Sequence, residues 1–210
     1  MQNLLASLRL WAVTLAVCCV AYPAAILLVG QAVAPASAEG SLVRAADGRV
    51  VGSELIAQGF SSPEYLWPRP SAVDYDASAT GGSNLSPTNP ALAERAREII
   101  AQHGLADGER IPAELVTASG SGMDPHLSLA GALFQAPRVA AARGIAVEDV
   151  ERIIESAAVS ASGVSEADRA VTVLRVNLLL DEAAPAVPAA RTDRRAPLAV
   201  PTDTTASPDA

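Results

Sequence analysis

Apolar residues fill the first part of the chain without a charged interruption. From Leu10 to Ala38 no residue is charged, and a helix needs about 20 apolar residues to cross a bilayer. The pattern predicts one membrane-spanning helix over residues 10–33, preceded by residues 1–9. Pro23 lies inside this run, where a membrane helix tolerates a kink.

A cleaved signal peptide is the alternative interpretation of this run. Arg9 precedes it, and the small residues Ala36, Ser37 and Ala38 fit a cleavage site that would release a secreted binding module. The apolar part of a signal peptide is usually about 7–15 residues long, so the longer run favours a retained anchor. Arg9 before the span places the N-terminus in the cytoplasm, and the remaining chain is then expected outside it.

Residues 39–182 have the length of one folded domain. Two apolar stretches flank residues 45–48, where a glycine favours a turn, and they indicate a β-hairpin. Residues 183–210 have proline spaced through alanine, threonine and aspartate. This composition buries too little apolar surface to offset the entropy of ordering, so we predict a disordered C-terminal tail.

Helical periodicity dominates the second half of the domain. Asn89 and Pro90 are an N-cap and a first-turn proline for a helix over residues 91–103. Further helices are predicted over residues 128–143, interrupted by Pro137 and closed by Gly144, and over residues 147–158; residues 171–181 suit a strand or a helix. Strands in front and helices behind predict a single α+β domain, a compact mixed α/β arrangement, after the transmembrane helix.

Composition and charge exclude several classes of function. All 15 basic residues are arginines, so the chain has no lysine for a phosphate-binding loop or a Schiff base. From Glu39 onward 23 acidic residues face 14 arginines, a net charge of −9 that disfavours nucleic acid. Cys18 and Cys19 lie in the apolar run, and His103 and His126 are too few for a zinc site. We expect no metal site.

The stretch SGSGMDPHLS, residues 119–128, gathers the residue types of a hydrolytic triad. It holds Ser121, Asp124 and His126, so a membrane-anchored serine hydrolase is one alternative function. The nucleophile motif G-x-S-x-G lacks its first glycine here. A glycine-serine turn in which Asp124 or Ser128 caps the next helix fits the spacing better.

A second glycine-rich stretch, TGGSNL, occupies residues 80–85 and includes Ser83 and Asn84. A phosphate cradle needs a strand before such glycines and a helix directly after them. Pro87 and Pro90 follow instead, so we expect an ordered loop that leads into the helix of residues 91–103.

Short motifs recur in order from the span to about Asp181. They are Gly40-Ser41, Gly52-Ser53, Leu55-Ile56, Gln58, Phe60, Tyr65, Arg69-Pro70-Ser71-Ala72, residues 81–85, Asn89-Pro90, residues 119–128, residues 135–140, Arg143-Gly144, Asn177-Leu178 and Asp181. Together they resemble the C subunits of Kdp potassium-transporting P-type ATPases. The chain departs from that pattern at Leu66, Met123 and Leu127 and in its C-terminal tail.

The resemblance implies a single-pass accessory subunit of a high-affinity potassium uptake complex in the bacterial inner membrane. Its partners would be a channel-like potassium-binding subunit, an ATP-hydrolysing P-type subunit and a small stabilising membrane peptide. The subunit would not be an enzyme and would have no tightly bound cofactor. It would act as a catalytic chaperone that raises the ATP affinity of the hydrolysing subunit, so ATP would enter only through the complex.

The resemblance also implies candidate site residues. Gln135 matches a glutamine implicated in nucleotide contact, and Arg138 lies three positions further on nearly the same helical face. The pair could bind a phosphate, contact a partner, or satisfy a kink at Pro137. Candidates for a structural or partner-binding role are Arg69, Ser83, Asn84, Ser121, Asp124 and His126. ATP is cytoplasmic, which conflicts with an outward domain, and we give the topology more weight than a direct nucleotide contact.

Overall fold

The computed structural model describes residues 2–45, 48–105, 108–160 and 168–184. These residues divide into two compact units, one ending at Ser53 and the other beginning at Glu54. The predicted tail lies outside the described residues, except for Ala183, which ends the last helix, and Ala184.

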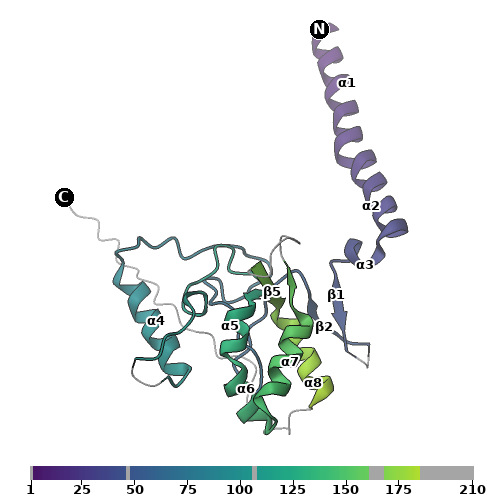
Figure 1. Cartoon of the computed structure of the whole chain (residues 1–210). Helices are drawn as coiled ribbons and strands as arrows, with labels where there is room; N and C mark the ends of the chain where they lie inside the picture. The colour runs from purple at the N-terminus through teal and green to yellow at the C-terminus, as the bar shows by residue number, and fades with distance from the viewer. Residues whose placement is uncertain (1, 46–47, 106–107, 161–167, 185–210) are drawn as a thin grey trace, which may run out of the picture. The chain divides into compact units, whose positions relative to one another are not determined.

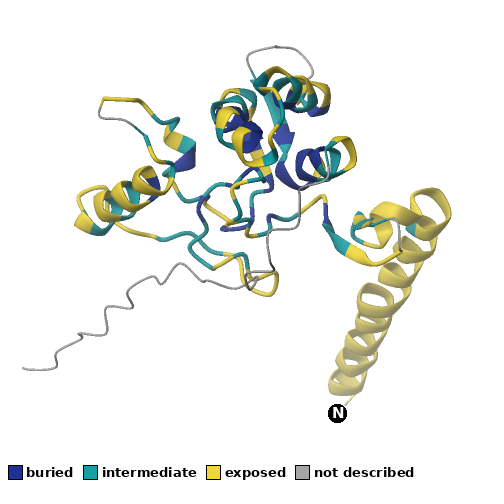
Figure 2. Cartoon of the chain, turned by 90° about the horizontal axis from the view of Figure 1, so that it is seen from below, coloured by how far each residue is buried: buried dark blue, intermediate teal, exposed yellow. Residues whose placement is uncertain are grey.

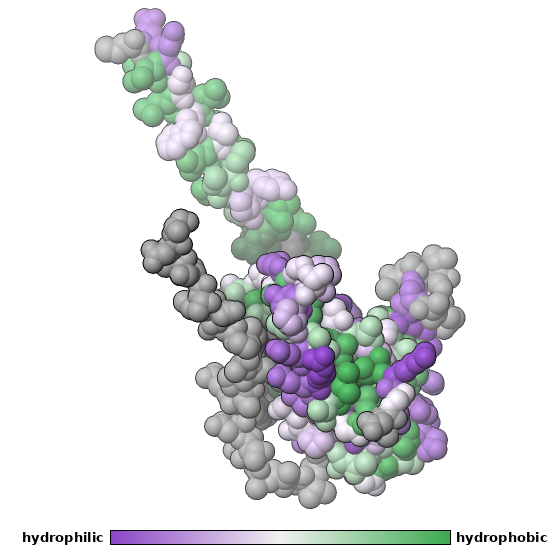
Figure 3. All heavy atoms as spheres, turned by 90° about the vertical axis from the view of Figure 1, so that its left-hand side faces the viewer, coloured by the Kyte–Doolittle hydropathy of each residue, from purple (hydrophilic) through white to green (hydrophobic). Residues whose placement is uncertain are grey.

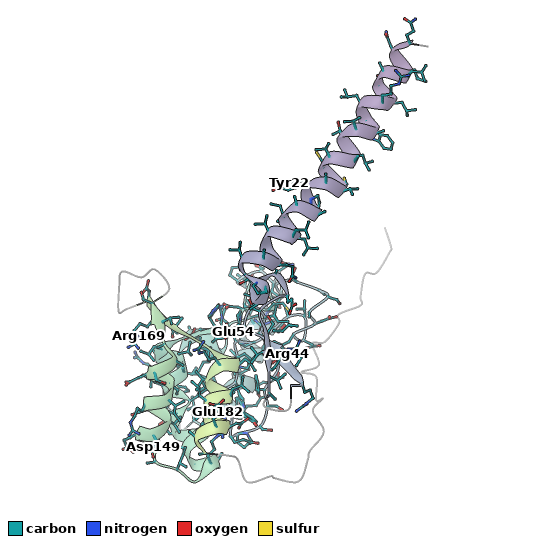
Figure 4. All side chains as sticks on the ribbon, turned by 90° about the vertical axis from the view of Figure 1, so that its right-hand side faces the viewer. Tyr22, Arg44, Glu54, Asp149, Arg169 and Glu182 are labelled. Carbon is teal, nitrogen blue, oxygen red and sulfur yellow. The ribbon has the colours of Figure 1, made fainter. Side chains whose placement is uncertain are left out.

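Unit 1 begins with one long helix built from α1 (Gln2–Ala16), the π-helical turn η1 (Val17–Ala21) and α2 (Tyr22–Val33). In the part of the chain that the structure describes, it is the one helix long and apolar enough to cross a membrane. Its side chains project on all sides, the ring of Tyr22 among them (Figure 4), and its surface is largely apolar (Figure 3). The helix ends at the predicted residue and begins eight residues earlier than the uncharged run.

Pro23 explains the irregular turn within this helix. A proline lacks a backbone N–H, and its ring crowds the carbonyl four residues before it. Directly before Pro23, the N–H of Tyr22 donates to the carbonyl of Val17, five residues back. The wider turn accommodates the proline, and the helix continues to Val33.

A short helix and a hairpin complete unit 1. Helix α3 (Pro35–Ala38) is followed by strands β1 (Leu42–Arg44) and β2 (Val50–Ser53), which pair antiparallel. The Oγ of Ser53 donates to the carbonyl of Gly40 at 2.7 Å and closes the base of the hairpin. The predicted hairpin is confirmed, although its second strand stops at Ser53.

Unit 2 contains five α-helices and a three-stranded antiparallel sheet in the order β3-β5-β4 among the described residues (Figure 1). The strands are β3 (His126–Ser128), β4 (Val159–Ser160) and β5 (Arg169–Thr172). The helices are α4 (Pro90–Gln102), α5 (Leu129–Phe134), α6 (Ala136–Arg143), α7 (Val147–Ala157) and α8 (Val173–Ala183), with a 3-10 turn η2 (Ala113–Leu115) before β3.

The α+β class and the helices are confirmed, with one correction to the element order. The expectation of strands only in front is wrong, because β3, β4 and β5 lie among the helices. These strands have two to four residues, too few to show an alternating pattern. The ambiguous residues 171–181 contain both structures, because β5 ends at Thr172 and α8 begins at Val173.

The core of unit 2 lies between α5–α8 and the sheet, where the buried residues gather in Figure 2. Helix α7 contributes Val150, Ile154 and Ala157 at helical spacing. The other buried core members are Leu66, Leu115, Leu127, Ala132, Ala136, Val139, Ala140, Val171, Val173, Val176 and Leu180. Leu66 comes from a segment without helix or strand, and that segment organises the site.

Candidate functional site

Residues 60–70, here called the strap, contain no helix or strand, yet Leu66, Pro68 and Pro70 are buried. A buried backbone must still satisfy its N–H and C=O groups. In the strap these groups bond largely to side chains of α8, α6 and Gln135, the residue between α5 and α6.

Two buried amide side chains hold consecutive residues of the strap. Asn177 on α8 accepts from the N–H of Leu66 at 2.8 Å and donates to its carbonyl at 3.1 Å. Gln135 accepts from the N–H of Trp67 at 2.9 Å and donates to its carbonyl at 3.0 Å. Gln135 is 1% exposed and Asn177 is 2% exposed. Each amide therefore pairs with one strap residue as a neighbouring β-strand would.

Gln135 occupies this position because the predicted helix of residues 128–143 breaks there. Ser128 caps α5 by accepting from the N–H of Gly131, and α5 ends at Phe134. Pro137 lies in the first turn of α6, where its missing N–H leaves no intrahelical bond unmade. The interruption predicted at Pro137 is confirmed as a break between two helices.

Arg138 reinforces the contact between α6 and the strap. Its guanidinium donates to the carbonyls of Pro63 and Tyr65 at 2.7 and 3.1 Å and to Oε1 of Gln135 at 2.7 Å. It also lies 3.8 Å from the ring centroid of Trp67, a cation–π contact. Burial lowers the pKa of Arg138 to about 10, and the charge of Glu64 acts in the opposite direction. The residue stays charged at neutral pH.

Arg143, at the end of α6, joins the strap to the end of α8. Its side chain is fully buried and donates to the carbonyls of Glu64, Leu180 and Ala184 and to Asp181 at 2.7–2.9 Å. The hydroxyl of Tyr65 donates to the same carboxylate at 3.1 Å. Burial, followed by the charge of Asp181, raises the pKa of Tyr65.

An aromatic cluster lies beside Trp67. The ring of His103, at the end of α4, is 5.0 Å from Trp67 and 5.9 Å from Phe134 between centroids. Burial, followed by the charge of Arg138, lowers the pKa of His103 to about 4. His103 is therefore neutral at pH 7.

The structure brings together the two glycine-rich stretches that the sequence separates. The N–H of Gly81 donates to the carbonyl of Ser121 at 2.9 Å. Gly122 has φ 68°, and a Cβ there would lie 2.5 Å from Val73 and 2.8 Å from the carbonyl of Gly81. Only glycine fits this approach, so the two stretches form a packed pair of loops.

Three of the candidate residues form one hydrogen-bonded group at the end of the strap. Arg69 donates to Oδ2 of Asp124 at 3.1 Å, and Oδ1 of Asp124 accepts from the backbone N–H of His126 at 3.0 Å. The ring of His126 lies 3.3 Å from the same oxygen. This group fixes the turn that precedes β3.

The hydroxyl of Ser121 is engaged with its own turn. Its Oγ accepts from the N–H of Met123 at 3.1 Å, while Asp124 and His126 pair with each other. The predicted glycine-serine turn is therefore present, with Ser128 capping the next helix. Asn84 is exposed with φ 52°, and Ser83 is half-buried beside it.

Sequence reasoning selected Gln135 and Arg138 but did not select the residues that share their contacts. Those residues are Tyr65, Trp67, His103, Arg143, Asn177 and Asp181. Asn177 could have been predicted from the sequence, because it is a single amide on an otherwise apolar face of α8. A polar side chain on a buried face requires a partner.

Comparison with known proteins identifies the family. The model of the family "K+-transporting ATPase, c chain" (KdpC) matches residues 4–182. The potassium-transporting ATPase KdpC subunit of Parvibaculum lavamentivorans is 50% identical over 181 residues, which cover 86% of this chain and 97% of that protein. The KdpC subunit of Caulobacter sp. strain K31 is 50% identical over 169 residues (79% and 86%), and that of Janthinobacterium sp. strain Marseille is 45% identical over 182 residues (84% and 96%).

The matched region contains nearly all of the apolar helix, the strap and the helices that hold it. The sequence motifs, the single apolar helix and the alignment with whole relatives lead to the same assignment. This chain belongs to the KdpC family, the c chain of K+-transporting ATPases.

Proposed function

We propose that this chain is a single-pass accessory subunit of an ATP-driven potassium uptake complex. The observation that carries the proposal is the 50% identity to a potassium-transporting ATPase KdpC subunit over 97% of that protein's length. The exposed apolar helix of residues 2–33 supplies an anchor. Its partners are a channel-like potassium-binding subunit, an ATP-hydrolysing subunit and a small membrane peptide, and ATP hydrolysis belongs to the partner.

We further propose that the anchor is retained and that unit 2 lies outside the cytoplasm. The small residues Ala36, Ser37 and Ala38 form most of α3, and the N–H groups of Gly40 and Ser41 fold back onto this turn. A turn closed by these hydrogen bonds does not present the extended chain of a cleavage site. Arg9, before the apolar run, favours a cytoplasmic N-terminus.

The proposed effect on ATP affinity then acts through subunit contacts. The amide of Gln135 is buried and bonded to Trp67 and Arg138, so a nucleotide could reach it only after the strap moved away. We therefore propose that Gln135 supports the shape of unit 2, and that this shape stabilises the ATP-binding state of the hydrolysing partner across the membrane.

Co-purification tests the assembly. The tagged full chain, expressed with the other subunits in cells that lack their own c chain, should purify with the two large membrane subunits and restore growth at low potassium. Loss of growth without the tagged chain is the control. Purification of the tagged chain alone, with no restored growth, would contradict the proposed function.

Two measurements on the same cells test the anchor and the orientation. Intact mass should show a chain that retains the helix, and a species beginning at Glu39 would indicate a secreted module. In a Cys18→Ser, Cys19→Ser background, Ala93→Cys on the exposed side of α4 should react with an impermeant maleimide in intact cells. Labelling only after lysis would place unit 2 in the cytoplasm.

A further inference from the structure

Helix α4 lies outside the main apolar core of unit 2. Ile99 is its one buried residue, and no residue of α4 belongs to the core cluster. In Figures 1 and 2 the helix stands to one side of α5–α8. Few side chains therefore hold its inner face.

The side chain of His103 supplies one of these contacts at the C-terminal end of α4. Its ring packs on Trp67 of the strap and on Phe134 of α5. The charged group that lowers the pKa of His103, after burial, is Arg138 of α6, which lies over the same tryptophan. The strap contributes Glu64, whose negative charge raises the pKa of Arg138.

The other charged side chains of α4 do not offset the electrostatic effect of Arg138 on His103. Glu94, Arg97 and Glu98 are exposed to solvent, and Arg95 is half-buried. Exposed charges are screened by water and salt. A proton on His103 would thus place a second positive charge near the half-buried guanidinium of Arg138, in a partly desolvated site.

We propose that His103 is an acid-sensitive latch: the neutral imidazole holds the end of α4 against the strap, and its protonation releases α4 while α5–α8 and the sheet remain folded. Besides Ile99, the inner side of α4 has only half-buried side chains, among them Leu92 and Ala96, so little apolar contact opposes this charge repulsion. The released state exposes Trp67 and the adjoining surface of the strap.

The size of the effect follows from the two protonation equilibria. The pKa of His103 is about 4 with α4 docked and about 6.5 for an imidazole in water. At pH 5 the released state should gain about 30-fold in population over its value at pH 8. Above pH 7 the latch stays closed.

The regulatory meaning of the latch rests on the proposed function, because an extracytoplasmic unit 2 would meet the external pH directly. Acidification would then change the surface that the subunit offers to its partners. The latch itself is a property of the isolated chain and does not depend on assembly.

The test uses the full chain in detergent micelles. Trp67 and Trp11 are its two tryptophans, so Trp11→Phe makes Trp67 the sole fluorescent reporter. Hydrogen exchange of α4, compared with α7 in the same sample, reports local release. The variant His103→Phe keeps an aromatic ring that cannot titrate, and His126→Asn removes the other histidine, which is exposed.

Between pH 8 and pH 4.5 the parent should show a transition in Trp67 emission. At pH 5 the amides of α4 should exchange about 30-fold faster in the parent than in His103→Phe, while α7 exchanges equally in both. The variant His126→Asn should behave as the parent. Equal acid responses in the parent and His103→Phe, or simultaneous loss of protection in α4 and α7, would overturn the latch.

These outcomes are independent of the assembly test. A chain that fails to join the potassium-transporting complex but shows the transition refutes the proposed function and keeps the latch. A chain that assembles but shows no transition dependent on His103 refutes the latch and keeps the proposed function.

Discussion

The strap and helix α7 are both packed into unit 2, and they are held there by opposite means. Helix α7 satisfies its backbone internally and presents Val150, Ile154 and Ala157 to the core. The strap buries Leu66 just as completely, but its peptide groups depend on side chains from other elements. A buried segment without regular structure requires polar side chains in places where the sequence pattern predicts apolar ones.

This difference changes the interpretation of polar residues in the helical region. Four polar side chains each donate a hydrogen bond to a carbonyl of residues 63–67. They are Gln135, Arg138, Arg143 and Asn177. Polar side chains in a chain of the KdpC family invite a ligand-binding interpretation. Here most of their hydrogen-bonding capacity is used by the protein's own backbone.

The largest expected effect is at Arg143. Arg143→Met removes a buried guanidinium and leaves three carbonyls and the carboxylate of Asp181 without this donor. Asp181 is 41% exposed, so the cost comes mainly from the buried carbonyls, at about 1–3 kcal/mol in the free energy of unfolding for each acceptor left without a partner. Urea unfolding of the full chain in detergent micelles, followed by circular dichroism, measures it.

Arg152→Met is the matched control for that change. Arg152 pairs with Asp149 on the exposed surface of α7 at 2.9 Å, and such pairs contribute about 0–1 kcal/mol. If the two substitutions had equal effects, the strap would not depend on Arg143 in the way that its contacts indicate.

The next effect concerns the two amides. Gln135→Ala and Asn177→Ala each leave one N–H and one C=O of the strap buried without a partner. Each should lower the free energy of unfolding by about 2–4 kcal/mol. In assembled complexes, both changes should raise the ATP concentration for half-maximal hydrolysis to a similar extent, because both disturb the same strap. A shift for Gln135→Ala alone would restore a nucleotide role for this residue.

The sequence was sufficient to predict the helices and the N-terminal hairpin. The helices could be predicted because caps and periodicity act locally. The signals were the caps Asn89 and Gly144 and the helical spacing of Val150, Ile154 and Ala157. The long uncharged run likewise gave the apolar helix of unit 1. Such features depend on neighbours within a few positions along the chain.

The strap and the small sheet could not be obtained in this way. Leu66 and Asn177 are 111 positions apart, and Trp67 and Gln135 are 68 apart. No periodic pattern encodes a pairing of a loop backbone with a distant side chain. The sequence pointed to Gln135 and Arg138 through a family resemblance, while their roles depend on contacts formed only in the folded chain.

A smaller effect is expected at Tyr75, in the segment that follows the strap. The hydroxyl of Tyr75 donates to the carbonyl of Arg69 at 2.9 Å, and burial, followed by the charge of Asp74, raises its pKa to about 12. Tyr75→Phe should cost about 1 kcal/mol at pH 7. Unfolding in urea at pH 7 and pH 11.5 checks both this loss and its pH dependence.

The sign of that dependence follows from the raised pKa. The unfolded tyrosine ionises near pH 10, so its contribution is complete below pH 10 and is lost as the pH rises toward 12. The parent should therefore lose more stability than Tyr75→Phe between pH 9 and pH 11.5. Parallel alkaline curves for the two proteins would show that Tyr75 is not buried in solution.

The smallest effect is expected at the N-terminus of α4, which is regular like α7 but lies outside the core. The side chain of Asn89 accepts from the N–H of Ala91 at 2.9 Å, and loss of a cap on an exposed helix costs about 0.5 kcal/mol. Asn89→Ala should raise hydrogen exchange in α4 by about 2-fold and leave the strap and α7 unchanged. Asn89→Ser should restore the parent rate, because serine is also a good cap. If Asn89→Ala also destabilised the strap, then α4 would be part of the cooperative core, and the contrast between a self-sufficient helix and a side-chain-dependent strap would not hold.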